Sequence, residues 1–332
     1  MSRPLRKTSL ASILFAGALL AVAVTADAQQ AKKVPRIGYI TNAPLQSVAV
    51  RYEAFRQGLH ELGYGDGKNI IIEYRSAEGK PDRFPMILEE LARLKVEVIV
   101  TGGGTVTRAA KESGVTMPIV MANDSDPVGN GFVASLARPS GNITGLANYR
   151  PEISGKQLEL LKEIIPRLTR VAVLGTTTQP GNEQSLKETE LAAGTLGVKI
   201  QYLEVLDSKN FVAVFQAAIK GKAEAMLLMS GAVFTSQRKQ IVDLAVKNRL
   251  PTIYPQSDYM DDGGLMFYGP NITELFRRAA TYVDKILKGA RPADLPVEQP
   301  KKFEFIINLK AAKQIELTIP PTVLLRADKV IR

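Results

Sequence analysis

VEVIVTGGGTVTRAAKESGVTMPIVM, residues 96–121, contains a strand, a glycine-rich turn, a helix and a second strand in succession. Val96–Val100 and Pro118–Met121 are short apolar runs rich in β-branched residues, which favour strands. Thr105–Glu112 between them has a helical pattern. Strands joined through a helix in this way usually run parallel. The stretch therefore predicts a parallel sheet with helices packed on both of its faces.

The same alternation extends in both directions and then restarts near residue 150. The 304 residues that follow position 28 exceed what one hydrophobic core usually supports, so we expect two α/β lobes. In the first lobe we expect strands at 36–40 and 69–74 and helices at 48–62 and 81–94. In the second we expect strands at 170–174, 199–203, 225–229 and 252–254, and helices at 152–165, 183–196, 210–220 and 234–247.

Three extended segments are flanked by glycine, proline and asparagine: Thr144–Ala147, Leu265–Tyr268 and Phe303–Ile307. A chain that crosses three times between two lobes needs such segments, and a hinge of several strands allows closing about a fixed axis. The alternative is that they are ordinary edge strands. The predicted fold class is α/β, with two doubly wound parallel-sheet lobes joined by a three-segment hinge.

The N-terminus has the layout of a secretory signal. Arg3, Arg6 and Lys7 precede the uncharged stretch Leu10–Val24, and Ala26-Asp27-Ala28 supplies small residues for a peptidase. We expect residues 1–28 to be removed, with cleavage after Ala28, and the protein to be periplasmic. The alternative is an uncleaved anchor, but 15 apolar residues fall short of the roughly 20 that span a bilayer.

Composition excludes several kinds of chemistry. The chain has no cysteine, which excludes disulfides and thiolate sites. It has one histidine, His60, which we expect to be an exposed residue of a helix. We expect no metal, no cofactor and no catalytic residue. The formal net charge is +10, and it is +8 once Arg3, Arg6, Lys7 and Asp27 are removed with residues 1–28. The basic residues are dispersed, so we expect no nucleic-acid partner.

Several stretches resemble a known family. They include EAFRQGLHELGY (53–64), DPVGNGFVASLARPSGNITGL (126–146) and IPPTVLLRADKVI (319–331). The chain is similar to the ABC transporter substrate-binding proteins of the tryptophan/tyrosine-type binding family, a branch of the type I periplasmic-binding-protein fold. This resemblance implies an N-terminal lobe of residues 34–146 and 270–300, and a C-terminal lobe of residues 150–266 and 303–332. It also implies a small-molecule solute bound between the lobes, and ABC transporter membrane subunits as partners of a monomer.

Ligand-binding residues should lie after the carboxyl ends of the strands, because these ends face the crevice of a doubly wound sheet. The glycine-rich turn at 102–104 precedes a helix, and free N–H groups at a helix start suit a carboxylate. The alternative is a tight turn without a ligand, with Thr105 as helix N-cap. In the first lobe we select Thr41, Asn42, Gly103, Gly104, Thr105, Asp124 and Ser125.

The second lobe offers short polar groups at the matching places, Thr176, Ser230 and Gln256. Tyr149 and Tyr268 end two of the expected crossings, where each could cover a ligand or pack in the core. A glycine-rich helix start with acidic groups opposite suits a zwitterion, so we expect an amino acid or else a small carboxylate.

The predicted function is a periplasmic binding protein that delivers such a solute to an ABC importer. A ligand-sensing receptor for a membrane signalling partner is the alternative, since it would use the same fold. An exported α/β hydrolase is disfavoured because no G-x-S-x-G elbow is present.

Overall fold

The computed structural model describes residues 34–149, 152–300 and 302–332 of the chain. The predicted signal peptide (1–28) and the cleavage site after Ala28 lie outside the described residues. None of the helices within these three ranges combines the length and the apolar character needed to cross a membrane.

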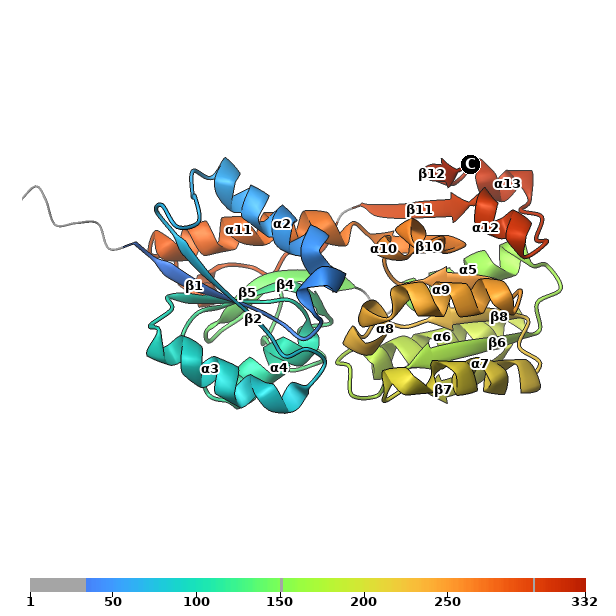
Figure 1. The fold of residues 1–332 in the computed structure, drawn as a ribbon, viewed down its shortest axis with the longest axis horizontal. Helices are drawn as coiled ribbons and strands as arrows, with labels where there is room; N and C mark the ends of the chain where they lie inside the picture. Colours follow the sequence, from blue (N-terminus) through green and yellow to red (C-terminus); the bar gives the residue numbers. More distant parts are fainter. Residues whose placement is uncertain (1–33, 150–151, 301) are drawn as a thin grey trace, which may run out of the picture. The chain divides into compact units, whose positions relative to one another are not determined.

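Five parallel strands form the first sheet, which is covered by helices on both faces (Figure 1). The strands are β1 (Arg36–Thr41), β2 (Ile71–Ser76), β3 (Val98–Thr101), β4 (Ile119–Ser125) and β5 (Ile143–Tyr149). The helices are α2 (Leu45–Glu61), η2 (Pro81–Arg83), α3 (Phe84–Arg93), α4 (Gly104–Glu112), α11 (Ile272–Leu287) and η4 (Pro292–Asp294).

The order of strands in the first sheet is β2-β1-β3-β4-β5. Successive side chains point to opposite faces, so Ile37 and Tyr39 join one core cluster and Ile40 joins another. Helices α2 and α11 pack on the face with Ile37, whereas α3 and α4 pack on the face with Ile40. The carboxyl ends of all five strands thus meet at one edge of a helix-covered sheet.

Seven strands form the second sheet, again with helices on both faces (Figure 1). The strands are β6 (Arg170–Gly175), β7 (Lys199–Glu204), β8 (Ala225–Leu228), β9 (Thr252–Tyr254), β10 (Met266–Pro270), β11 (Phe303–Asn308) and β12 (Lys329–Ile331). One face carries α5 (Glu152–Ile164), α6 (Asn182–Leu196), α12 (Leu309–Gln314) and α13 (Pro321–Leu324). The other carries η3 (Ser208–Asn210), α7 (Phe211–Lys220), α8 (Ala232–Ser236), α9 (Arg238–Lys247) and α10 (Asp258–Asp261).

The order of strands in the second sheet is β12-β11-β10-β9-β8-β6-β7. Strands β10 and β11 pair antiparallel, and the other neighbours pair parallel. Two predicted hinge segments are therefore strands inside this sheet, and the third, β5, is the edge strand of the first sheet.

The chain passes between the two sheets three times. It leaves the first sheet after β5, returns from β10 to α11, and leaves again between Val297, which packs in the first core, and β11. The peptide N–H of Glu298 donates to the Gly145 carbonyl at 3.0 Å, which ties the last passage to the first. These passages confirm the predicted fold class of two α/β lobes joined by three segments, and the crossings lie at the ends of the predicted strands.

One local expectation, Thr105 as a helix N-cap, was wrong. Helix α4 begins at Gly104 with Gly103 as its N-cap, so Thr105 is not the cap. Gly103 has φ of 143°, a conformation that glycine tolerates and other residues rarely adopt.

Candidate functional site

A cavity lies among the loops that follow the carboxyl ends of strands in both sheets, the place where open α/β sheets bind ligands. The first sheet contributes loops after β1 and β3 and the last residues of β4 and β5, and the second contributes loops after β6, β8 and β9. The cavity holds about 560 Å³ of space free of protein atoms, part of it open to solvent. Eight predicted site residues line it: Thr41, Asn42, Gly103, Gly104, Thr105, Ser125, Ser230 and Gln256.

The other four predicted residues do not line this cavity. Asp124 is buried behind its wall, and Thr176 is buried with its hydroxyl 2.9 Å from that of Thr178. The Tyr268 ring stacks on Phe303 with a centroid separation of 6.1 Å. Tyr149 is the last residue of β5, and its side chain lies outside the described part.

Sequence reasoning did not select several polar lining residues, Arg51, Asn123, Asn148, Gln179 and Thr235. The Arg51 position carried a signal that could have been read. Val48, Arg51 and Phe55 share the buried face of α2, at the spacing of one helical stripe. A charged residue on such an apolar stripe needs a specific partner, because an unpaired buried charge is costly.

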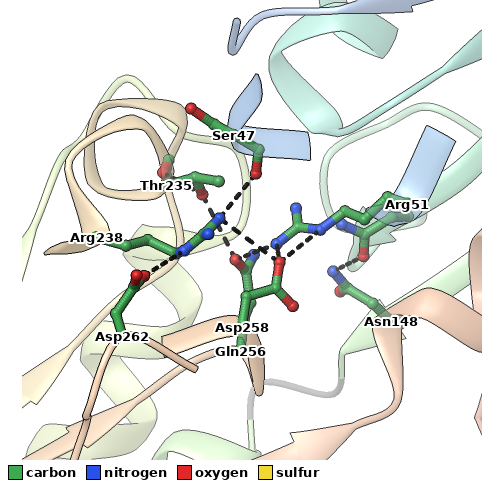
Figure 2. A network of polar contacts seen from close by, with 10 residues as sticks. Ser47, Arg51, Asn148, Thr235, Arg238, Gln256, Asp258 and Asp262 are labelled. Atoms are coloured by element: carbon green, nitrogen blue, oxygen red, sulfur yellow. Dashed lines mark hydrogen bonds and ion pairs between the residues drawn. The ribbon is translucent and has the colours of Figure 1, made fainter. Parts of the chain in front are cut away.

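Arg51 is held from across the cavity by Gln256, in the loop after β9, and Asp258, at the start of α10 (Figure 2). Its side chain is only 4% exposed. Nε and Nη2 donate to Oδ2 of Asp258 at 3.2 and 2.7 Å, and Nη2 also donates to Oε1 of Gln256 at 2.6 Å. Among the residues that the structure describes, no acceptor is found for Nη1 of Arg51, which leaves that nitrogen available to a ligand.

A second arginine completes this contact between the lobes. Nη1 of Arg238 donates to the Ser47 carbonyl of α2 at 2.7 Å and lies 3.8 Å from Oδ2 of Asp258 (Figure 2). Burial alone would raise the pKa of Asp258, but the positive charges of Arg51 and Arg238 outweigh it and hold that pKa below its usual range. Asp258 is thus a carboxylate that orients Arg51.

The opposite side of the cavity has its own contact between the lobes. The Thr105 hydroxyl donates to Oε1 of Gln179 at 3.1 Å. A β-carbon added at Gly104 would lie 3.1 Å from Cβ of Pro180, so the Pro180 ring packs close to the backbone of Gly104. The loop before α6 therefore closes over the start of α4.

Amide side chains cover the end of β4 and β5. Nδ2 of Asn148 donates to Oδ1 of Asn123, and the Ser125 hydroxyl donates to Oδ1 of Asn148 at 3.3 Å. Oδ1 of Asn42 is buried and, within the described part of the chain, has no hydrogen-bond partner. Such orphaned polar atoms are uncommon in proteins, and a bound solute could satisfy this one.

Asp124 lies directly behind Gly104 and is 1% exposed. Its Oδ2 accepts a hydrogen bond of 2.5 Å from the Thr107 hydroxyl, while Oδ1 has no partner among the described residues. Burial raises the pKa of Asp124 to about 8, and the Thr107 hydrogen bond opposes this only in part. Asp124 is therefore mostly protonated at neutral pH and is screened from the cavity by Gly104.

The lining as a whole can hydrogen-bond a small polar solute and favours a negatively charged group. Its side chains are amides, hydroxyls, small apolar groups and the guanidinium of Arg51. The free N–H groups at the start of α4 add positive potential on the other wall. A carboxylate is the group that this combination suits best.

Comparison with known proteins identifies what the chain is similar to. The family model described as ABC transporter substrate binding protein matches residues 44–331. A tyrosine-binding protein of Clostridioides difficile is 23% identical over 286 residues, which covers 86% of this chain and 82% of that protein.

Solved structures with the same fold include the following two. A conserved domain protein from Vibrio cholerae superposes with a TM-score of 0.84 at 26% identity, covering 90% of this chain and 100% of the other. An ABC domain from Streptococcus pneumoniae, solved in complex with L-Trp, has a TM-score of 0.82 at 24% identity, with coverage of 90% and 99%.

Proposed function

Because the chain belongs to the ABC transporter substrate-binding proteins, we propose that it binds an amino acid or a related small carboxylate in the cavity between its two sheets. Bound solute would then be handed to the membrane subunits of an ABC importer. The family is one of binding proteins, so the cavity needs affinity and selectivity rather than catalytic groups.

The observation that carries this proposal is the environment of Arg51. Its guanidinium is fixed on one side by Asp258 and Gln256, and Nη1 has no acceptor within the described part of the chain. A planar guanidinium with a fixed orientation loses little freedom when it binds a carboxylate oxygen. The start of α4 lies on the same cavity and favours the same charge.

The relatives support the amino-acid part of this proposal. One is described as a tyrosine-binding protein, and one solved neighbour contains L-Trp. The predicted signal at residues 1–28 supports a location outside the cytoplasm, where a binding protein meets its solute. The lobe boundaries proposed from the sequence, 34–146 with 270–300 and 150–266 with 303–332, would place Arg51 and Asp258 on different lobes.

Closing of the lobes would follow from these contacts. Arg51–Asp258 and Thr105–Gln179 link the two sheets on different sides of the cavity. A solute that contacts both sheets stabilises the arrangement in which these bonds are made, since a ligand shifts the population toward the state that it binds better.

The proposal is tested by thermal unfolding of the purified protein with a panel of solutes. The panel holds the standard amino acids, small mono- and dicarboxylic acids, and uncharged sugars. We expect a rise in Tm only with members of the first two groups, because these carry the carboxylate proposed to bind Arg51. A ligand at 100 times its Kd stabilises the folded state by about 2.7 kcal/mol. A rise given by uncharged sugars alone would contradict the proposed solute class.

A further inference from the structure

The cavity carries one positive charge and no negative charge. Arg51 is the single ionisable side chain among the described residues that line it. In a site for zwitterions, an acidic side chain usually pairs with the ammonium group of the ligand, because burying an unpaired ammonium is costly. The sequence places Asp124 in that role.

The structure removes Asp124 from contact with a solute. Its carboxyl group lies behind the backbone of Gly104, so close that a β-carbon on Gly104 would be 2.9 Å from Oδ1. Its other oxygen is occupied by the Thr107 hydroxyl. Burial also raises the pKa of Asp124 to about 8, so the group is largely uncharged at neutral pH.

The acceptors that remain on the cavity wall are neutral. Asn42 lines the cavity, and its Oδ1 is buried without a hydrogen-bond partner among the described residues. A solute hydroxyl can donate to this oxygen, and it can accept instead if the amide is turned so that Nδ2 takes its place. An ammonium group fits only the first orientation, and it keeps its charge without a counterion.

We propose that the cavity accepts α-hydroxy acids as well as α-amino acids, with the carboxylate on Arg51 and the α-substituent on neutral groups that include Asn42. This inference rests on the proposed function. A hydroxyl loses less hydration than an ammonium when it leaves water, which offsets the stronger hydrogen bonds of the ammonium. The two ligands of a matched pair should therefore bind with similar affinity.

The test is calorimetric titration of the purified protein with matched pairs. Suitable pairs are L-tyrosine with L-3-(4-hydroxyphenyl)lactate, and L-alanine with L-lactate. We expect the Kd values within a binding pair to differ by less than about tenfold, equivalent to about 1.4 kcal/mol. An amino acid that binds more than tenfold more tightly than its hydroxy acid overturns the inference and leaves the proposed function intact. If none of the standard amino acids and small carboxylic acids binds, the proposed function fails as well.

Asn42→Asp tests the assignment to Asn42 directly. It puts a carboxylate on the cavity wall, so we expect the preference within each pair to move toward the amino acid by at least about tenfold. Asn210→Asp is the matched control, because it adds the same charge at an exposed residue away from the cavity. An unchanged ratio in a folded Asn42→Asp protein, shown by its Tm, would overturn the role given to Asn42.

Discussion

Asp124 occupies a place where burial, rather than a charged partner, controls its protonation. It is 1% exposed, and the Thr107 hydroxyl is its hydrogen-bond partner. Burial raises its pKa to about 8 in the folded protein, whereas a carboxyl in an unfolded chain titrates near 4. The folded state therefore keeps a proton that the unfolded state loses between these two pH values.

This difference predicts how stability depends on pH. Between about pH 4 and pH 8 the folded protein binds one more proton, at Asp124, than the unfolded chain does. The free energy of unfolding therefore falls as pH rises through that window. Asp124→Asn cannot titrate, so we expect the free energy of unfolding of the variant to fall less steeply with pH, by up to about 1.4 kcal/mol per pH unit. Urea unfolding from pH 5 to 8 measures this slope. Equal slopes for the variant and the unchanged protein would show that Asp124 is not buried as a neutral acid.

The site residues show what the sequence can predict at this scale. Loops after strand ends were identifiable, and Asn42, Ser230 and Gln256 line the cavity because topology alone places them there. Arg51 was missed since it lies on a helix, where its role depends on Asp258, 207 positions further along the chain. Asp124 was selected because it lies near the end of a strand, but its burial depends on the close approach of the Gly104 backbone.

At the scale of elements, α2 and α11 show how one glycine permits close packing. A β-carbon on Gly58 of α2 would lie 2.2 Å from the Arg277 carbonyl oxygen and 2.9 Å from Cβ of Ala280. The two helices, more than 200 residues apart in sequence, cover the same face of the first sheet. Their close approach fixes the orientation of α2, and with it the position of Arg51.

Gly58→Ala should therefore destabilise the protein despite the better helix propensity of alanine. The methyl group forces the helices apart, and overpacking of this kind costs about 1–3 kcal/mol. Gly194→Ala is the matched control, because Gly194 is an exposed glycine of α6 with no atom near its β-carbon position. That change should be neutral or stabilise by up to about 1 kcal/mol. Urea unfolding measures both, and equal effects of the two substitutions would contradict the packing described for α2 and α11.

Most elements could be predicted because their apolar patterns are long and regular. The strands β1, β6 and β9 and the helices α5 and α6 lie within one or two residues of the predicted positions. The short elements α10, α12, α13 and β12 were not predicted, because segments of three to six residues carry too little periodicity and form through tertiary packing. The helix expected at 234–247 is divided into α8 and α9 at Gln237.

At the scale of the whole molecule, the cavity depends on residues that the chain brings together from both sheets. Arg51 reaches Asp258 and Gln256, and Thr105 reaches Gln179. The number of crossings could be predicted from segments flanked by breakers, but these contacts could not, because no local pattern encodes which loops meet. The proposed function rests on them, since solute binding and lobe closing use the same side chains.

The proposed function requires that the solute carboxylate binds Arg51 in this cavity. Calorimetric titration of Arg51→Gln, with the solute that raises Tm most, measures this contact. The variant loses the positive charge and the Nη1 donor proposed for the carboxylate, so we expect Kd to rise about 30- to 100-fold, equivalent to about 2–3 kcal/mol. Arg56→Gln is the control, because it removes the same charge from an exposed position of α2 and should change Kd less than about twofold. Wild-type affinity in a folded Arg51→Gln protein would contradict the account.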